Sequence, residues 1–249
     1  MAPIRKGDGT PLEMPGVSEV RSGDGRVFFE GGAIPDSVID NFEDADADPP
    51  GNYEEGETLA DYYSGATNTH SRTTSDVIEG DKAFNIDSDE IYEALWSRPG
   101  DGLNRYPEPG DKLGALIRSN GGSFGLFFNV EDGSSPGGYS AYIFSDPNDM
   151  ALVRKDDLSD FTSDTETTLD STSVSLTDGD WYWFEVQPQW GGDIVFDLYE
   201  VDESTLERGN HIEGLTSTDL TYEDERGVGL YSRGSSAIGT SADWLRILD

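Results

Sequence analysis

The sequence predicts an all-β protein in which two antiparallel sheets pack face to face as a jelly-roll sandwich. Apolar and polar residues alternate with period 2 along many short segments, and Gly, Asp, Asn and Pro residues separate these segments. Convincing helical periodicity is missing. Alternation of this kind gives each strand one face for a shared core, which is the arrangement of two packed sheets. The length of 249 residues is sufficient for one such domain with a short extension.

Residues 1–37 differ from the rest of the chain and predict a separate N-terminal arm. Gly-Asp-Gly occurs at residues 7–9 and again at 23–25, and both copies are turn signals. The short runs beside these turns are suited to a small hairpin. We therefore expect an attachment arm over residues 1–37 and a sandwich over residues 38–249.

From residue 38 onward the chain is a succession of candidate strands. The segment 123–130 places four alternating side chains on one face: Phe124, Leu126, Phe128 and Val130. In a later segment, Trp181 and Trp183 share one face, and either this face or the opposite one must be core. The same alternation extends over further segments: 112–119, 139–144, 193–201, 227–232 and 242–248. The polar stretch 158–177 predicts a long loop or an exposed edge hairpin.

The charge of the chain predicts a salt-saturated environment. Acidic residues outnumber basic ones by 51 to 16, which gives a formal net charge of −35. Such a charge opposes a compact state in dilute buffer, but in roughly molar salt the Debye length falls to about 3 Å and screens most of the repulsion. Aromatic residues make up 11% of the chain and cluster in strand-like runs, which argues against disorder. We therefore expect a halophilic source.

Composition also argues against several classes of partner and site. An acidic chain lacks the basic patch that nucleic acid requires. No apolar stretch approaches the roughly 20 residues of a membrane span, and the start of the chain carries no secretory signal. The chain has no cysteine, and its imidazoles are His70 and His211. Disulfides, a histidine-based zinc site and a serine–histidine triad are therefore not expected.

Aromatic residues supply the candidate ligand-binding side chains. Indole and phenol rings offer platforms for sugar rings, and the candidate residues are Trp96, Tyr142, Trp183, Trp190 and Tyr231. The alternative is that these rings pack in the core or in an interface, where large aromatic residues are common. The sequence favours this alternative.

Two acidic patterns suggest further chemistry, and each has a simpler interpretation. Oxygen ligands at positions 1, 3, 5 and 12 of a calcium loop are matched by Asp44, Asp46, Asp48 and Glu55. Pro49 stands where such a loop needs glycine, so a solvated acidic loop is the alternative, and Asp40 with Asp243 is a second candidate pair. No cofactor is expected to be required, and Ca²⁺ is the one ion that these residues suggest.

The run Glu200-Val-Asp-Glu-Ser204 is similar to a glycosidase strand that carries Glu-x-Asp-x-Glu. Ser204 replaces the last acid, so one catalytic carboxylate is missing. We expect no enzymatic activity from these residues.

Several runs together resemble the concanavalin A-like, laminin-G-like jelly-roll superfamily. They are residues 38–44 as the first strand, 77–86 as an early segment, 124–130 with 138–144 as a central pair, 181–186 with 194–199 as a hairpin, and 227–231 with 242–248 as the closing pair. The resemblance covers residues 38–249. It implies a concanavalin A-like sandwich, a fold used mostly by extracellular binding modules.

The arm has a resemblance of its own. The run Arg5-Lys-Gly-Asp-Gly-Thr-Pro-Leu-Glu-Met-Pro-Gly16, with residues 27–31 and 34–37, is similar to the N-termini of structural proteins in tailed viruses of haloarchaea. The resemblance implies a homo-oligomeric virion surface protein on a turret, tail fibre or baseplate, assembled in the host cytoplasm. Residues 1–37 would join other virion proteins, and the sandwich would meet a host-surface glycan or glycoprotein. The alternatives are a carbohydrate-active enzyme of the same fold and a haloarchaeal cell-surface adhesion module.

Overall fold

The structure is a computed structural model of the chain. It describes these residues: 20–21, 27–28, 38–40, 54–55, 68–73, 83–88, 92–99, 103, 105–118, 123–133, 136–144, 148–158, 166–202, 207–233 and 238–248. The chain divides into two compact units, Met1–Pro35 and Asp36–Asp249. In the first unit, β1 (Val20–Arg21) pairs antiparallel with β2 (Val27–Phe28). The attachment role expected of residues 1–37 stays a prediction.

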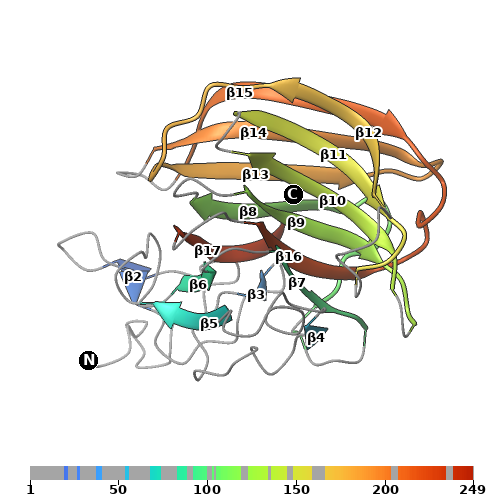
Figure 1. The fold of residues 1–249 in the computed structure, drawn as a ribbon, viewed down its shortest axis with the longest axis horizontal. Helices are drawn as coiled ribbons and strands as arrows, with labels where there is room; N and C mark the ends of the chain where they lie inside the picture. The colour runs from blue at the N-terminus through green and yellow to red at the C-terminus, as the bar shows by residue number, and fades with distance from the viewer. Residues whose placement is uncertain are drawn as a thin grey trace, which may run out of the picture. The chain divides into compact units, whose positions relative to one another are not determined.

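The second unit is the two-sheet antiparallel sandwich that the sequence predicts (Figure 1). One sheet has seven strands in the order β12 (Glu166–Ser173), β11 (Asp149–Lys155), β10 (Gly138–Phe144), β9 (Ser123–Val130), β16 (Gly227–Arg233), β7 (Tyr92–Ser97) and β4 (Glu54–Glu55). The other has eight: β15 (Glu207–Thr218), β14 (Asp193–Asp202), β13 (Trp181–Pro188), β8 (Lys112–Arg118), β17 (Ile238–Leu248), β6 (Ala83–Ser88), β5 (Asn68–Thr73), and β3 (Val38–Asp40), which pairs with β17. The described residues contain no helix, and so none that could span a membrane.

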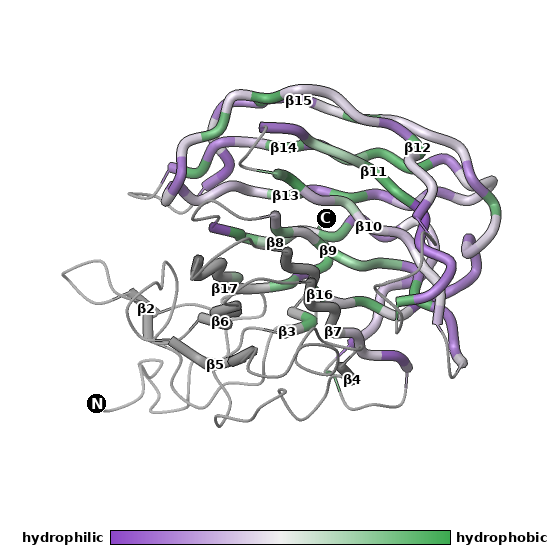
Figure 2. Tube along the Cα trace, in the orientation of Figure 1, coloured by the Kyte–Doolittle hydropathy of each residue, from purple (hydrophilic) through white to green (hydrophobic). Residues whose placement is uncertain are grey.

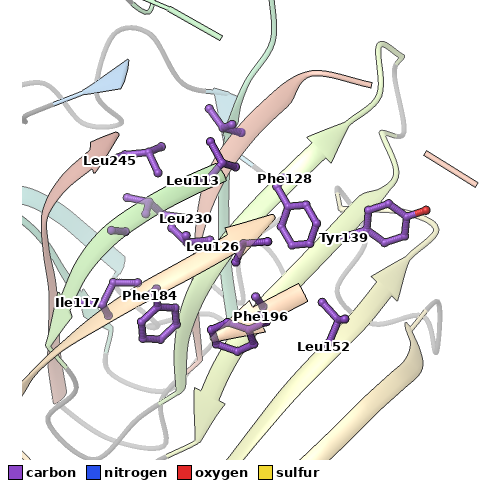
Figure 3. Close-up of a cluster of buried hydrophobic side chains, with 14 of the residues drawn as sticks. Leu113, Ile117, Leu126, Phe128, Tyr139, Leu152, Phe184, Phe196, Leu230 and Leu245 are labelled. Carbon is purple, nitrogen blue, oxygen red and sulfur yellow. The ribbon is translucent and has the colours of Figure 1, made fainter. Parts of the chain in front are cut away.

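The core lies between the sheets and is built by the period-2 alternation of their strands. Its central members include Leu126 and Tyr139 from the seven-stranded sheet and Ile117, Phe184 and Phe196 from the eight-stranded one (Figure 3). Phe184 and Phe196 are fully buried with ring centroids 5.3 Å apart. Burial of one such ring stabilises the fold by about 1.5–3 kcal/mol. Apolar stretches alternate with polar ones along β8 to β11 (Figure 2).

One face assignment is wrong, and a bulge explains it. The sequence places Val130 on the face of Phe124 and Phe128, but Val130 packs on the opposite side of its sheet, with Phe127. The register between β9 and β16 shifts between Gly227 and Val228, so one residue of β9 is extra. This residue is Asn129, whose φ is +49°. An extra residue reverses the alternation beyond it.

The predicted closing pair of strands differs in placement from its expectation. The closing pair, 227–231 and 242–248, forms β16 and β17, which belong to different sheets. Each pairs instead with strands that are distant in sequence: β16 pairs with β9 and β7, and β17 pairs with β8 and β6.

In the polar stretch 158–177, β12 is the edge strand of the seven-stranded sheet, which agrees with the predicted exposed edge.

Candidate functional site

A cluster of aromatic and charged side chains covers the outer face of the eight-stranded sheet at β13, β14 and β15. We call it the Trp183 face and define it by six residues: Trp183, Glu185, Asp197, Tyr199, Arg208 and His211. Strand register brings them together, because Trp183 lies opposite Tyr199, Tyr199 lies opposite His211, and Glu185 lies opposite Asp197. Directly opposed residues share one face of a sheet and are close enough for side-chain contact.

Glu185 is the buried centre of this face. Its side chain is 5% exposed and its carboxylate accepts from three donors. Oε1 accepts from the indole Nε1 of Trp183 at 3.0 Å and from Nη1 of Arg208 at 2.5 Å. Oε2 pairs with Nζ of Lys112, from β8, at 3.3 Å. A buried carboxylate is costly unless it is paired and hydrogen-bonded, and here both conditions are met.

Tyr199 organises the second part of the face. The guanidinium carbon of Arg208 lies 4.7 Å from the centroid of the Tyr199 ring, and the His211 ring meets the same phenol edge-on at 5.0 Å. Burial raises the pKa of Tyr199, and the charges of Asp197 and Glu185 raise it further. The hydrogen bond to Glu185 raises the pKa of Arg208 above its already high ordinary value. Tyr199 is therefore a neutral ring and Arg208 a permanent cation.

Gly214 makes room for the third pair on this face. Oδ1 of Asp197 lies 3.0 Å from Nε2 of His211, so the carboxylate reaches across β15. A Cβ at position 214, directly opposite Asp197, would stand 2.6 Å from that oxygen. Glycine at this point therefore allows the two side chains to meet over the strand.

The arrangement is suited to holding a ligand in a fixed geometry. Glu185 is occupied by its donors, so it acts as a clamp on Trp183, Arg208 and Lys112. Aromatic rings with fixed orientation, beside donors whose positions are already set, bind a ligand with little loss of side-chain entropy. The two carboxylates of this face, Glu185 and Asp197, are both engaged by cationic or imidazole partners.

The five candidate sugar-binding residues fall at three different places. Trp183 belongs to the face described above. Trp190 lies at the β13–β14 turn and is 68% exposed. Trp96 and Tyr142 lie on the outer face of the seven-stranded sheet, where they are 3% and 4% exposed and pack in a shared apolar cluster. Tyr231 lies on β16, and its side chain is outside the described residues.

Sequence reasoning missed Glu185, Asp197, Tyr199, Arg208 and His211 as members of the site. Two of them carry a signal. Glu185 follows Trp183 at i+2 and so shares its face, and a hairpin centred on Gly191 places Tyr199 opposite Trp183. Arg208 and His211 had no such signal, because the register between β14 and β15 shifts around Tyr199.

The acidic motifs stay predictions. Asp44, Asp46 and Asp48 lie outside the described residues, as does the side chain of Glu55, whose backbone forms β4. The side chains of Asp40 and Asp243, on the paired strands β3 and β17, are also outside them. Within the described residues no group of three acidic or imidazole side chains is arranged to hold a metal ion. Glu200 is exposed, and its Oε2 accepts from Nδ2 of Asn210 at 2.7 Å.

Comparison with known proteins identifies the fold. No protein-family model matches the sequence, and no curated protein matches it. Among solved structures, the legume lectin-like domain from Entamoeba histolytica has a TM-score of 0.51 at 11% identity, over 80% of this chain and 90% of that one. The carbohydrate binding module CBM66 from Bacillus subtilis has a TM-score of 0.48 at 10% identity, over 73% and 93%. The exoplasmic/lumenal domain of VIP36, in its Ca²⁺/Man3GlcNAc-bound form, has a TM-score of 0.47 at 9% identity, over 74% and 83%.

The two antiparallel sheets of this chain and its likeness to the Entamoeba histolytica domain lead to the same fold. The chain has the concanavalin A-like, legume-lectin-like jelly-roll sandwich.

Proposed function

We propose that this chain is a non-enzymatic glycan-binding protein whose sandwich binds sugar through the Trp183 face. The observation that carries the proposal is the clamp at Glu185, which fixes the Trp183 indole by a hydrogen bond of 3.0 Å and holds Arg208 and Lys112 beside it. An aromatic ring beside preset polar groups is the usual composition of a sugar site. The lectin-like fold supports the same function.

We also propose where the protein acts: on the surface of a virus that infects halophilic archaea. The net charge of −35 supports a salt-saturated environment. The run at residues 5–16, with its similarity to structural proteins of haloarchaeal tailed viruses, supports a particle. The sandwich would face outward from a turret, tail fibre or baseplate, as a homo-oligomer, and residues 1–37 would join it to other virion proteins during assembly in the host cytoplasm.

Replacing Trp183 with alanine should weaken glycan binding about tenfold, which corresponds to about 1.4 kcal/mol. The variant loses the indole ring as a surface for the sugar. It also removes the hydrogen bond from Nε1 of Trp183 to Oε1 of Glu185, the atom to which Arg208 bonds. The measurement is titration calorimetry in molar sodium chloride with oligosaccharides released from the surface of a halophilic archaeon. Trp183→Phe should lose less affinity than Trp183→Ala, because it keeps an aromatic ring but lacks the hydrogen bond to Glu185.

Trp190→Ala is the matched control for this experiment. It removes an indole that is exposed at the β13–β14 turn and lies outside the Trp183 face. Its affinity should equal that of the unaltered protein. Loss of binding in Trp190→Ala, with Trp183→Ala unaffected, would move the site to the turn. Absence of any glycan binding would refute the proposed function, and release of shortened sugar products would show an enzyme.

Deleting residues 1–37 should leave a folded sandwich that no longer joins its assembly. The reason is that Met1–Pro35 and Asp36–Asp249 are separate compact units, and the described core cluster has members from both sheets of the second unit. Immunogold labelling of purified particles, with full-length and truncated chains expressed in the host, measures incorporation. If the truncated chain is incorporated as well as the full one, the arm is not the anchor. If the full chain is absent from particles and present on cells, the protein is a cell-surface module.

A further inference from the structure

We infer that the glycan bound at the Trp183 face is an acidic sugar, and that Arg208 binds its carboxylate or sulfate oxygens. This inference rests on the proposed function and adds to it the chemical class of the ligand. It begins from the way Arg208 is held.

Arg208 is fixed at two points and open elsewhere. Nη1 bonds to Oε1 of Glu185 at 2.5 Å, and the guanidinium lies over the Tyr199 ring with its carbon 4.7 Å from the centroid. The side chain is nevertheless 46% exposed. Among the residues that the structure describes, no acceptor bonds to Nε or Nη2 of this guanidinium. Its remaining donors are therefore available to a ligand.

An arginine held in this way favours a planar or tetrahedral oxyanion. The guanidinium carries its donors in a rigid fork that matches two oxygens of a carboxylate or a sulfate. Most of the entropy of the long side chain is already lost to Glu185 and Tyr199, so a ligand does not have to order it. A neutral hydroxyl would engage one donor at a time and would use less of this geometry.

The aromatic residues place a sugar ring next to the fork. Trp183 lies directly opposite Tyr199 in the register of β13 and β14, and Arg208 lies over Tyr199. A ring that contacts the Trp183 indole can therefore present a substituent toward Arg208. Both side chains are anchored to the same Oε1 of Glu185, which sets their relative position.

Directional hydrogen bonds from Arg208, rather than the electrostatic potential of the whole protein, must provide the selectivity for acidic over neutral sugars. Lys112 and Arg208 balance Glu185 and Asp197 in formal charge, and His211 bonds to Asp197. The chain as a whole is strongly acidic and repels anions. In molar salt the Debye length is about 3 Å, so neither the charges of the Trp183 face nor the net charge of the chain acts over a longer range. A two-point contact at hydrogen-bond distance is therefore the interaction that distinguishes the ligands. The inference therefore predicts that geometry at Arg208 matters more than its charge.

The test compares one oligosaccharide backbone in three forms: neutral, carrying a uronic acid, and carrying a sulfate ester. Calorimetric titration in molar sodium chloride measures the affinity of each form for the unaltered protein, Arg208→Lys and Arg208→Ala. We expect the unaltered protein to favour at least one acidic form about tenfold over the neutral form, a difference of about 1.4 kcal/mol. Arg208→Lys keeps the charge but loses the fork, so its preference should fall close to that of Arg208→Ala. Arg208 belongs to the Trp183 face and bonds to Glu185, so both variants should also lose affinity for the neutral form, and the quantity compared is the ratio of acidic to neutral affinity within each variant.

Arg105→Ala is the control, because Arg105 is exposed to a similar extent, 41%, and its ion pair is with Asp111, away from the Trp183 face. It should leave the preference unchanged. Thermal unfolding of each variant in the same buffer confirms that the sandwich is intact. Equal affinity for all three sugar forms would overturn the inference and leave glycan binding in place. Absence of binding by any form would overturn the proposed function as well. If free sodium sulfate at the same concentration displaced the sulfated sugar, the site would bind anions without recognising the sugar. This result would also overturn the inference.

Discussion

Transfer from molar salt to about 0.1 M salt should unfold the sandwich in one cooperative transition. The change extends the Debye length from about 3 Å to about 10 Å, so repulsion among the carboxylates, which give the chain a net charge of −35, is no longer screened. Native proteins are stable by only about 5–15 kcal/mol, so we expect unscreened repulsion among the carboxylates to overcome this margin. Far-ultraviolet circular dichroism and tryptophan fluorescence during a salt titration measure the transition.

One place where this repulsion acts is visible at the end of the sandwich. Burial raises the pKa of Glu225, and the nearby carboxylates of Glu131, Asp132 and Asp224 raise it further. The ionised form of Glu225 is therefore disfavoured by its neighbours, and screening by salt relieves this cost. Glu225→Gln should accordingly shift the unfolding midpoint to lower salt.

Sucrose is the control for the salt titration. It favours the compact state by exclusion from the protein surface but screens no charge. If sucrose at low salt restores the fold as well as sodium chloride does, exclusion and not screening is the cause. Retention of the full native signal at about 0.1 M salt would contradict the prediction and with it the halophilic interpretation.

The second large effect is expected at Asp219, in the loop that joins β15 to β16 and so crosses from one sheet to the other. Its Oδ1 accepts from the hydroxyl of Tyr139 at 2.8 Å and from the backbone N–H of Thr221 at 2.9 Å. Its Oδ2 accepts from Nη1 of Arg154 at 2.9 Å. The Tyr139 hydroxyl lies at the edge of the core cluster and points away from it, toward this loop (Figure 3).

The same loop is held from a second side. Nδ2 of Asn129, at the bulge, donates to the carbonyl of Tyr222 at 2.9 Å. The backbone N–H of Tyr222 donates to the Tyr139 hydroxyl at 3.1 Å. Gly137 leaves room for the Tyr222 ring, because a Cβ there would stand 2.0 Å from the phenol oxygen. These contacts fix the crossing loop on the β9–β10 hairpin.

Asp219→Ala should lower the free energy of unfolding by about 1–3 kcal/mol, because it removes the carboxylate that accepts from the Tyr139 hydroxyl, the Thr221 N–H and Nη1 of Arg154. The Tyr139 hydroxyl keeps the carbonyl of residue 219 as an acceptor, and Arg154 keeps Asp156. Chemical denaturation in molar salt measures the change. Asp219→Asn keeps an acceptor oxygen and should lose about half as much. Glu207→Ala, which removes an exposed carboxylate from β15, should change stability little. A loss at Asp219 no larger than at Glu207 would show that the network does not stabilise the fold.

The Asp219 network also predicts a pH dependence. Burial alone would raise the pKa of Asp219, but hydrogen bonds from Thr221, Tyr139 and Arg154 stabilise the carboxylate more, so the pKa is lowered below the ordinary 3.8. A lowered folded-state pKa means that the contribution is present above pH 3.8 and is lost as the pH falls through the lower, folded value. The stability difference between the unaltered protein and Asp219→Asn should therefore shrink in that acid range. A difference that is constant from neutral pH to strong acid would contradict this assignment.

Much of the fold follows from local pattern, and the reasons are visible in particular strands. Tyr182, Phe184 and Val186 lie in the core and Trp181 and Trp183 on the outer face, because side chains of a strand alternate and the larger continuous apolar set must be buried. The pairing of β13 with β14 follows from a short turn between two such strands. Val130 departs from its pattern because Asn129 adds a residue, and a single polar residue in a strand does not announce a bulge.

The sequence by itself determined the sandwich, most of the strand faces and the strongly acidic net charge, since these depend on the period of apolar residues and on composition. Only the tertiary structure decided that residues 227–233 and 238–248 separate into different sheets, that Trp96 and Tyr142 are buried while Trp183 is half-buried, and that Glu185 holds Trp183, Arg208 and Lys112 together. These features join strands that are far apart in the chain or separated by register shifts. Contacts of this kind depend on which strands become neighbours, and local alternation carries no information about that choice.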